Sequence, residues 1–323
     1  MVQAIRVHET GGPEVMKLEQ IDLPPPGPGE VRIRNEAIGV NFIDIYYRSG
    51  LYPAPTPFTP GNEGAGVVLA VGEGVKGLKK GDRVAYVSTF GSYATERNAP
   101  AKDVVPLPKG ISFDKAAALM LKGLTCEYLL FRSFPVKSGS VILVHAAAGG
   151  VGQILTQWAN ALGCVVIGTV GSADKAKIAR KNGCHHVINY REENFVERVK
   201  EITKGAKCDV VYDGVGKDTF LASLDCLKPL GYLINFGSAS GPVDGFNVGI
   251  LSQKGSLYVQ RPTLFAYTSD RKTFEKMAKR LFKAVEDGDF KIPLSTKWAL
   301  ADAVKAHEAL AGRATTGSMV LKP

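Results

Sequence analysis

The pattern of hydrophobic and polar positions differs between the first part of the chain and the rest. Up to about residue 120, short segments alternate apolar and polar residues, as half-buried strands do. Clear examples are residues 30–37, 64–72 and 81–87. Proline and glycine clusters at 24–29 and 53–61 separate these segments. Because such clusters mark turns, the pattern predicts a compact β-rich domain.

A helical pattern begins at about Phe113, and strand and helix patterns alternate from Val141 onward. Helical stretches separate five apolar segments, at 141–145, 164–169, 186–189, 208–212 and 231–236. Such alternation predicts an α/β fold with a doubly wound parallel sheet. A long amphipathic helix is expected at 271–287, followed by a final strand at 317–321 that returns to the first domain.

These patterns divide the chain into three segments. We expect a β-rich domain at 1–122, a dinucleotide-binding domain at 123–264, and a C-terminal segment at 265–323 that belongs with the first domain. The length and the 45% hydrophobic content are sufficient for two separate cores.

A glycine-rich turn directly follows the first buried strand of the second domain. Gly149 and Gly152 occupy the second and third glycine positions of a G-x-G-x-x-G pattern, with Ala147 at the first. A helix is expected to begin there, since residues 154–159 are mostly apolar. Strand, glycine turn and helix in this order are typical of a dinucleotide site, in which the helix N-terminus attracts phosphate groups. The alternative is a tight turn without a ligand.

The end of the next strand, at residues 168–175, indicates which dinucleotide is bound. Sites for NAD usually place an acidic residue there to hold the ribose 2′-hydroxyl. This chain instead has Ser172, with Lys175 and Arg180 soon after. Because positive charge and hydroxyl donors suit a 2′-phosphate, the sequence favours NADPH over NADH. The alternative is that both cations only solvate a helix, and the nearby Asp174 keeps it open.

Composition excludes several classes of protein. No apolar run approaches the roughly 20 residues of a membrane span, and the N-terminus does not look like a signal peptide, so we expect a cytoplasmic enzyme without a membrane partner. The five cysteines are well separated, which indicates reduced thiols. The net charge of +9 would permit nucleic acid as a partner, but the basic residues are spread along the chain, so we do not expect one.

Five stretches together carry a family likeness: residues 39–52, 61–66, 145–152, 187–190 and 256–258. With them the chain resembles the medium-chain dehydrogenase/reductase superfamily, and most closely its zinc-free, zeta-crystallin-like quinone oxidoreductases. The resemblance implies a Rossmann-type sheet, a GroES-like catalytic domain and a homodimer.

The resemblance also argues against zinc chemistry. Zinc alcohol dehydrogenases of this superfamily carry a cysteine where Asn41 stands and a histidine where Asn62 stands. Amides are poor substitutes for these ligands, and residues 1–125 contain no cysteine for a structural zinc lobe. We therefore expect no metal site, and an acceptor that is already electrophilic, such as a quinone or a conjugated enone.

Family likeness also implies the site residues. Asn41 and Tyr46 would face the nicotinamide, and Tyr52 would line the acceptor pocket; these three are the catalytic candidates. Packing is the alternative role for the tyrosines. Asp44 is equally consistent with a functional acid and with a turn or ion-pair residue. The implied cofactor-binding set is Asn41, Tyr46, Tyr128, Gly149, Gly150, Val151, Gly152, Ser172, Lys175, Tyr190, Phe236, Gly237, Ser238 and Arg313. Gly214 departs from the pattern, since relatives can have serine there.

The sequence thus predicts an NADPH-dependent quinone oxidoreductase that works without zinc. A zinc-free enone or alkenal reductase is one alternative, because it needs the same fold and an open acceptor pocket. A non-catalytic role, as a structural protein or as an RNA-binding protein regulated by NADPH, is the other.

Overall fold

The computed structural model describes residues 1–312 and 315–323. The chain forms two compact units. The first comprises Met1–Leu124, Thr268–Phe282 and Ile292–Pro323, and the second comprises Thr125–Tyr267 and Lys283–Lys291. Two helices, α2 (Phe113–Tyr128) and α9 (Arg271–Asp287), contribute residues to both units.

The first unit is rich in antiparallel strands. Its strands are β1 (Val2–Val7), β2 (Met16–Ile21), β3 (Glu30–Val40), β4 (Glu63–Val71), β5 (Arg83–Val87), β6 (Glu96–Pro100), β7 (Val104–Pro106), β14 (Leu294–Ala299) and β15 (Ser318–Lys322). Its two further helices are α1 (Phe42–Arg48) and α10 (Ala303–Ala311), and short 3₁₀ turns lie at Pro13–Val15, Ala101–Asp103 and Leu300–Asp302.

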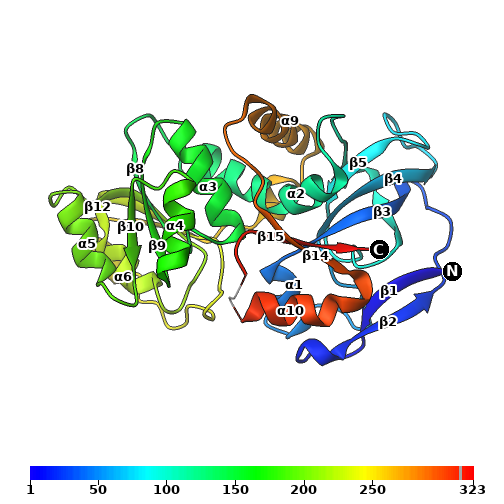
Figure 1. Ribbon diagram of the computed structural model, residues 1–323, viewed down its shortest axis with the longest axis horizontal. Helices are drawn as coiled ribbons and strands as arrows, with labels where there is room; N and C mark the ends of the chain where they lie inside the picture. Colours follow the sequence, from blue (N-terminus) through cyan, green and yellow to red (C-terminus); the bar gives the residue numbers. More distant parts are fainter. Residues whose placement is uncertain (313–314) are drawn as a thin grey trace. The chain divides into compact units, whose positions relative to one another are not determined.

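Seven of these strands form one sheet, in the order β14-β15-β3-β4-β5-β7, and β6 also pairs with β3. The C-terminal strand β15 runs antiparallel to β3, with Met319 opposite Val40, so the end of the chain lies beside one of its early strands (Figure 1). The remaining strands, β1 and β2, form a hairpin.

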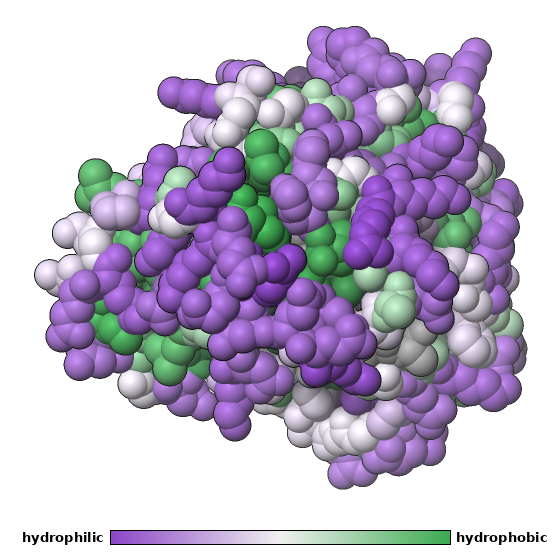
Figure 2. All heavy atoms as spheres, turned by 60° about the vertical axis from the view of Figure 1, so that its left-hand side comes forward, coloured by the Kyte–Doolittle hydropathy of each residue, from purple (hydrophilic) through white to green (hydrophobic). Residues whose placement is uncertain are grey.

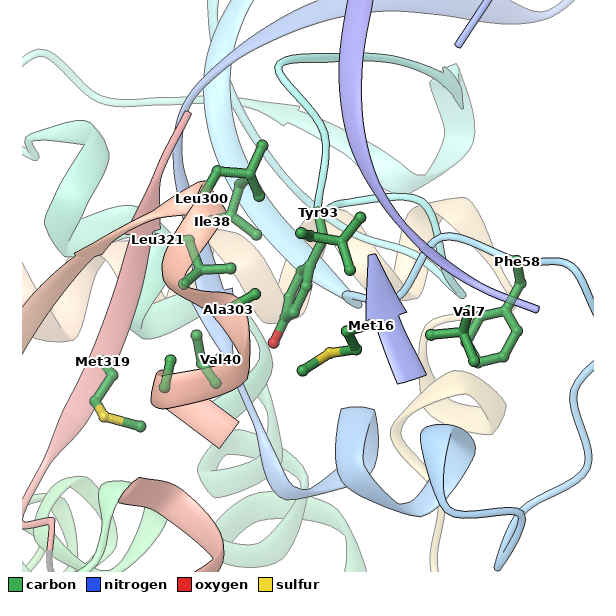
Figure 3. Packing of buried hydrophobic residues seen from close by; sticks show 12 residues of the cluster. Val7, Met16, Ile38, Val40, Phe58, Tyr93, Leu300, Ala303, Met319 and Leu321 are labelled. Carbon is green, nitrogen blue, oxygen red and sulfur yellow. The ribbon is translucent and has the colours of Figure 1, made fainter. Parts of the chain in front are cut away.

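A hydrophobic cluster joins this hairpin to the C-terminal elements of the first unit. Val7, Met16, Ile38 and Leu321 are among its buried members. Tyr93 is completely buried in the same cluster, and Figure 3 shows its ring between Ala303 and Met16. A polar hydroxyl is thus carried into an apolar core, where it requires a hydrogen-bond partner.

The second unit contains a six-stranded parallel sheet in the order β10-β9-β8-β11-β12-β13. Its strands are β8 (Val141–Val144), β9 (Val165–Val170), β10 (His186–Asn189), β11 (Cys208–Asp213), β12 (Leu227–Asn235) and β13 (Tyr258–Gln260). Its helices are α3 (Gly150–Ala161), α4 (Ala173–Lys181), α5 (Phe195–Ile202), α6 (Phe220–Asp225), α7 (Gly249–Gln253) and α8 (Leu264–Tyr267), and a π-helical turn occupies Leu129–Ser133.

The helices cover both faces of this sheet, with α3 and α4 on one side and α5 and α6 on the other (Figure 1). Val199 of α5 and Leu224 of α6 pack in one cluster with Leu143, Val211 and Leu233 from the central strands. The strand order reverses between β8 and β11, which places a topological switch point at the carboxyl end of β8, where open α/β sheets bind ligands.

The predicted α/β fold with a doubly wound parallel sheet is confirmed, as are the helix at 271–287 and the final strand, which lies at Ser318–Lys322. The fifth strand of the sheet was expected to begin at residue 231, but β12 begins at Leu227. Pro229 and Gly231 hide this start, and Leu230 has a φ of 62°, which fits a register shift between β11 and β12.

The surface, the helices and the thiols add three observations. Hydrophilic side chains cover most of the face in Figure 2. Throughout residues 1–312 and 315–323, no helix has the length and apolar character that crossing a membrane requires. All five cysteines are buried free thiols.

Candidate cofactor and acceptor sites

The glycine turn of the second unit leads directly into helix α3. The helix begins at Gly150. In its first backbone hydrogen bond beyond the turn, the Gln153 N–H donates to the Gly149 carbonyl oxygen at 2.9 Å. The N–H groups of residues 150–152 therefore come before the repeating ladder, which is the arrangement that binds phosphate.

Gly149 and Gly152 of this turn have different roles. A Cβ on Gly152 would approach the Ala146 carbonyl oxygen and Ala147 to less than 3.0 Å, so only glycine lets the helix pack on the turn. A Cβ on Gly149 would meet a single atom, the Ala146 oxygen at 3.2 Å, and open space otherwise. The space beside Gly149 thus fits a ligand that approaches the backbone closely.

Three of the predicted 2′-phosphate residues lie together at the carboxyl ends of β9 and β10. Ser172 is the N-cap of α4, and its hydroxyl accepts a hydrogen bond from the Lys175 backbone N–H at 3.3 Å. The Tyr190 hydroxyl lies over Gly171, where a Cβ would be 2.5 Å from it, and the tyrosine is 47% exposed. The nearby Asp174 carboxylate pairs with Lys177 at 3.0 Å, so a cation balances its charge.

Phe236, Gly237 and Ser238 form the loop that follows β12. Arg261, which sequence reasoning missed, holds this loop: its guanidinium donates to the carbonyl oxygens of Asn235 at 2.9 Å and Gly237 at 3.1 Å, and to the Ser238 hydroxyl at 3.1 Å. No sequence motif would have identified Arg261, because the loop precedes it by more than 20 positions.

Gly214 and Asp213 shape the neighbouring loop after β11. Serine at position 214 would place its Cβ 3.0 Å from the Phe236 ring, and Gly237 also packs against the Gly214 backbone. The Asp213 Oδ1 accepts hydrogen bonds from the Val215 and Gly216 N–H groups at 2.8 and 3.1 Å. The buried Oδ2 of Asp213 has no hydrogen-bond partner among the described residues.

Two further predicted cofactor residues have less support. Tyr128 is buried in α2 and stacks on Tyr267, with ring centroids 4.6 Å apart and planes 2° apart. Burial raises the pKa of the Tyr128 hydroxyl well above its usual value. Arg313 lies outside the described residues.

In the first unit, Asn41 is the N-cap of helix α1 and is buried. Its backbone N–H donates to Asp44 Oδ2 at 2.9 Å, and its Nδ2 donates to Glu63 Oε1 at 2.8 Å. Its Oδ1 accepts a hydrogen bond of 2.6 Å from the Lys122 ammonium. Neither Glu63 nor Lys122 was among the predicted site residues, since both lie far from Asn41 in the sequence.

The two candidate tyrosines of this unit lie next to each other. Tyr46 and Tyr52 meet edge to face, with ring centroids 5.2 Å apart, and the Tyr52 N–H donates to the Tyr46 carbonyl oxygen at 3.0 Å. Tyr46 is buried, whereas Tyr52 is half-buried. The neighbouring Tyr47 packs edge to face against Phe90, with ring centroids 4.5 Å apart.

Asp44 belongs to a buried polar chain. Besides the Asn41 N–H, its Oδ2 accepts a hydrogen bond from the Tyr93 hydroxyl at 3.0 Å. That hydroxyl is also 2.9 Å from His307 Nε2, and His307 Nδ1 is 3.2 Å from an Arg48 nitrogen. Burial raises the pKa of Asp44 from 3.8 to about 7, and its Oδ1 lacks a partner among the described residues.

The residues at the positions of the superfamily's zinc ligands do not fit a zinc ion. An ammonium group already lies 2.6 Å from Asn41 Oδ1, and its charge would repel a metal cation. Asn62 is completely buried, and its Nδ2 is directed at the Ser88 carbonyl oxygen at 3.4 Å. Within the described part of the chain, no three His, Cys, Asp or Glu side chains gather into a possible metal site.

Comparison with known proteins places the chain in a family. The zinc-binding dehydrogenase family matches residues 150–283, and the alcohol dehydrogenase GroES-like domain matches residues 27–109. A quinone oxidoreductase of Pseudomonas aeruginosa is 53% identical, with 100% of both chains covered. The chain belongs to the quinone oxidoreductase family. The resemblance inferred from the sequence, including the GroES-like domain, is thereby confirmed.

Two other relatives bear on cofactor and substrate. The crystal structure of Escherichia coli quinone oxidoreductase complexed with NADPH matches with a TM-score of 0.98 at 50% identity, covering 99% of this chain and 100% of that one. A 2-haloacrylate reductase of a Burkholderia species is 45% identical, covering 100% of this chain and 99% of the relative.

Proposed function

We propose that the chain is an NADPH-dependent quinone oxidoreductase that works without zinc. The arrangement of Ser172, Lys175 and Tyr190 is the observation that carries this proposal. It supplies two hydroxyl groups and a cation, with no acidic residue at the end of β9. The identity of 50% to an enzyme crystallised with NADPH supports it further.

The second unit would hold the cofactor. The pyrophosphate would lie against the N–H groups of Gly150 and Val151, in the space that Gly149 keeps open, while Gly152 lets α3 pack closely on the turn. Ser172, Lys175 and Tyr190 would surround the 2′-phosphate, and the loop of Phe236, Gly237 and Ser238 would contact the nicotinamide ribose, with Tyr128 and Arg313 as further contacts. When bound, NADPH supplies a hydride to the acceptor.

The first unit would supply the residues that act on the acceptor. We propose that Asn41 and Tyr46 face the nicotinamide end of the cofactor and that Tyr52 lines the acceptor pocket. A tyrosine ring stacks on a planar quinone, and its hydroxyl can donate to a quinone oxygen as negative charge develops there. In this arrangement residues 1–122 and 265–323 form the catalytic domain, and residues 123–264 form the NADPH-binding domain.

A second candidate function is reduction of an activated alkene. The identity of 45% to a 2-haloacrylate reductase supports it, since a haloacrylate carries a carbon–carbon double bond made electrophilic by its carboxyl group. Such an acceptor would need the same hydride donor and the same residues to stabilise charge on oxygen.

We propose a homodimer in the cytoplasm. Strand β13 lies at the edge of the parallel sheet, and its Tyr258 is 50% exposed and stacks on Tyr232 at 4.5 Å, which supports a second copy at this edge. Five free thiols suit a reducing compartment. Light scattering of the purified protein would give the subunit number.

The experiment for the main proposal follows NADPH oxidation at 340 nm with benzoquinone and with conjugated enones, in the presence of a metal chelator. We expect turnover of quinone with NADPH, and much weaker turnover with NADH. Reduction of enones but of no quinone would favour the second candidate. Binding of NADPH without turnover of any acceptor, together with salt-dependent retention of RNA that NADPH releases, would support a non-catalytic role instead.

A further inference from the structure

Glu63 and Lys122 form a buried ion pair beside Asn41. The Lys122 Nζ lies 3.2 Å from Glu63 Oε1, and the two side chains are 8% and 0% exposed. Glu63 lies at the start of β4 and Lys122 within α2, so the pair joins the central strands of the first sheet to a helix. The Leu121 backbone N–H donates to the other carboxylate oxygen, Glu63 Oε2, at 2.6 Å.

All three N–H groups of Lys122 have acceptors. They donate to the Val40 carbonyl oxygen at 3.2 Å, to Asn41 Oδ1 at 2.6 Å and to Glu63 Oε1 at 3.2 Å. An ammonium has three donors and no acceptor. Lys122 therefore has no donor left for a ligand, and any contribution that it makes must pass through the groups it contacts.

The pair determines the orientation of the Asn41 amide. Lys122 only donates and the Glu63 carboxylate only accepts, so the amide oxygen must face the lysine and the amide nitrogen must face the glutamate. The reversed amide would put its NH₂ against the ammonium and its oxygen against the carboxylate. In the orientation observed, Nδ2 uses one hydrogen on Glu63 and retains the other.

We propose that Lys122, together with Glu63, is a positioning residue that fixes the Asn41 amide so that its second N–H is donated to the acceptor oxygen on which negative charge develops. The inference rests on the function proposed above. A donor held in place before the reaction stabilises the developing charge without a cost of reorientation, which a freely rotating amide would incur.

The glycine opposite the pair supports this assignment. A Cβ on Gly39 would collide with the Glu63 carboxylate and with the Ala117 carbonyl oxygen. The strand β3 thus leaves space at this point for a buried charge and its ammonium partner.

The decisive test is a double-mutant cycle on quinone reduction. Lys122→Met removes the charge and keeps much of the side-chain volume, and we expect it to lower kcat/KM for quinone about 10- to 100-fold, in the range of a lost oxyanion donor. NADPH affinity, measured by calorimetry, should change less than twofold. In an Asn41→Ala background the same substitution should have almost no further effect. Lys115→Met, at an exposed lysine of the same helix, is the control and should match the wild type.

The proposal would be overturned if Lys122→Met lowered kcat/KM for quinone equally in the presence and absence of Asn41. It would also be overturned if Lys122→Met lowered only the affinity for NADPH. If the wild type itself reduces no quinone with NADPH, the proposed function fails. If the wild type reduces quinone and Lys122→Met has the same kcat/KM, only the positioning role is contradicted.

A second measurement, by NMR, tests the orientation of the Asn41 side-chain amide independently of catalysis. Selective ¹⁵N labelling of asparagine, with Asn41→Ala to assign the signal, should show one sharp pair of side-chain amide protons in the wild type. Lys122→Met should broaden or double this pair, and an unchanged pair would contradict the inference. Should Lys122→Met fail to fold, the Lys122→Met/Glu63→Gln variant removes both charges and permits the same two measurements.

Discussion

The hydroxyl of Tyr93 lies 3.0 Å from Asp44 Oδ2, and this hydrogen bond is one of a buried series in which the position of each proton can be assigned. Burial and the Arg48 charge lower the pKa of His307 to about 3, so the imidazole is neutral. Because Arg48 can only donate, His307 Nδ1 accepts from it and Nε2 carries the proton. Nε2 then donates to the Tyr93 oxygen, and the Tyr93 proton is left for Asp44.

Asp44 and His307 should give opposite pH dependences of stability. Burial raises the Asp44 pKa from 3.8 to about 7. The contribution of Asp44 to the free energy of unfolding is therefore complete below pH 4 and is lost as the pH rises to 7. The His307 pKa falls from 6.5 to about 3, so its contribution is complete above pH 6.5 and is lost as the pH falls. For each group, the free energy of unfolding changes by at most about 1.4 kcal/mol per pH unit. The two changes have opposite signs and offset each other between pH 4 and 6.5.

Asp44→Asn keeps an acceptor for Tyr93 but does not titrate. In this variant the free energy of unfolding should fall as the pH decreases from 6.5 to 4, whereas the wild type should stay nearly level. Urea unfolding of the protein at a series of pH values measures the difference. Asp22→Asn, at an exposed aspartate, should behave like the wild type, and parallel curves for wild type and Asp44→Asn would contradict the prediction.

Lys175→Ala should weaken the binding of NADPH about 10- to 100-fold, as expected for the loss of a charge-assisted contact to phosphate. It should weaken the binding of NADH less than twofold. The reason is that only NADPH carries the 2′-phosphate. Calorimetric titration with both nucleotides checks this, with Lys181→Ala, an exposed lysine at the end of the same helix, as the control. Equal losses for the two nucleotides would show that Lys175 does not contact the 2′-phosphate.

Tyr52→Ala should raise the KM for quinone severalfold and leave NADPH affinity nearly unchanged, because it removes a half-buried ring and leaves the second unit intact. Tyr52→Phe retains the edge-to-face contact with Tyr46 and removes only the hydroxyl. Steady-state kinetics of the two variants therefore separates stacking from hydrogen bonding. An unchanged KM in Tyr52→Ala would remove this residue from the acceptor site.

Gly149→Ala and Gly152→Ala should separate cofactor binding from stability. The added methyl group at 152 would collide with the turn before α3, so we expect a loss of about 2 kcal/mol or more in unfolding free energy. At 149 the methyl group meets only the Ala146 oxygen, so stability should change by less than about 1 kcal/mol while NADPH binding weakens at least tenfold. Thermal unfolding and calorimetry together test the pair, and the reverse assignment of effects would contradict it.

The sequence by itself determined the parts of this protein that depend on local order. Strand, glycine turn and helix follow one another within residues 141–161, so their hydrophobic period and the spacing of Gly149 and Gly152 were sufficient to predict this order of elements. The same holds for Ser172 and Lys175, which are linked by a capping bond across three residues. The start of β12 was mistaken, because Pro229 and Gly231 interrupt the apolar run that identifies a strand.

Only the tertiary structure decided what surrounds Asn41 and the loop after β12. Lys122 contacts Asn41 across 81 residues, His307 contacts Arg48 across 259, and Arg261 reaches the loop at 235–238 from another strand end. A buried charge is stable only where its partners converge in space, and that convergence depends on how strands and helices pack, which no local pattern of residues encodes.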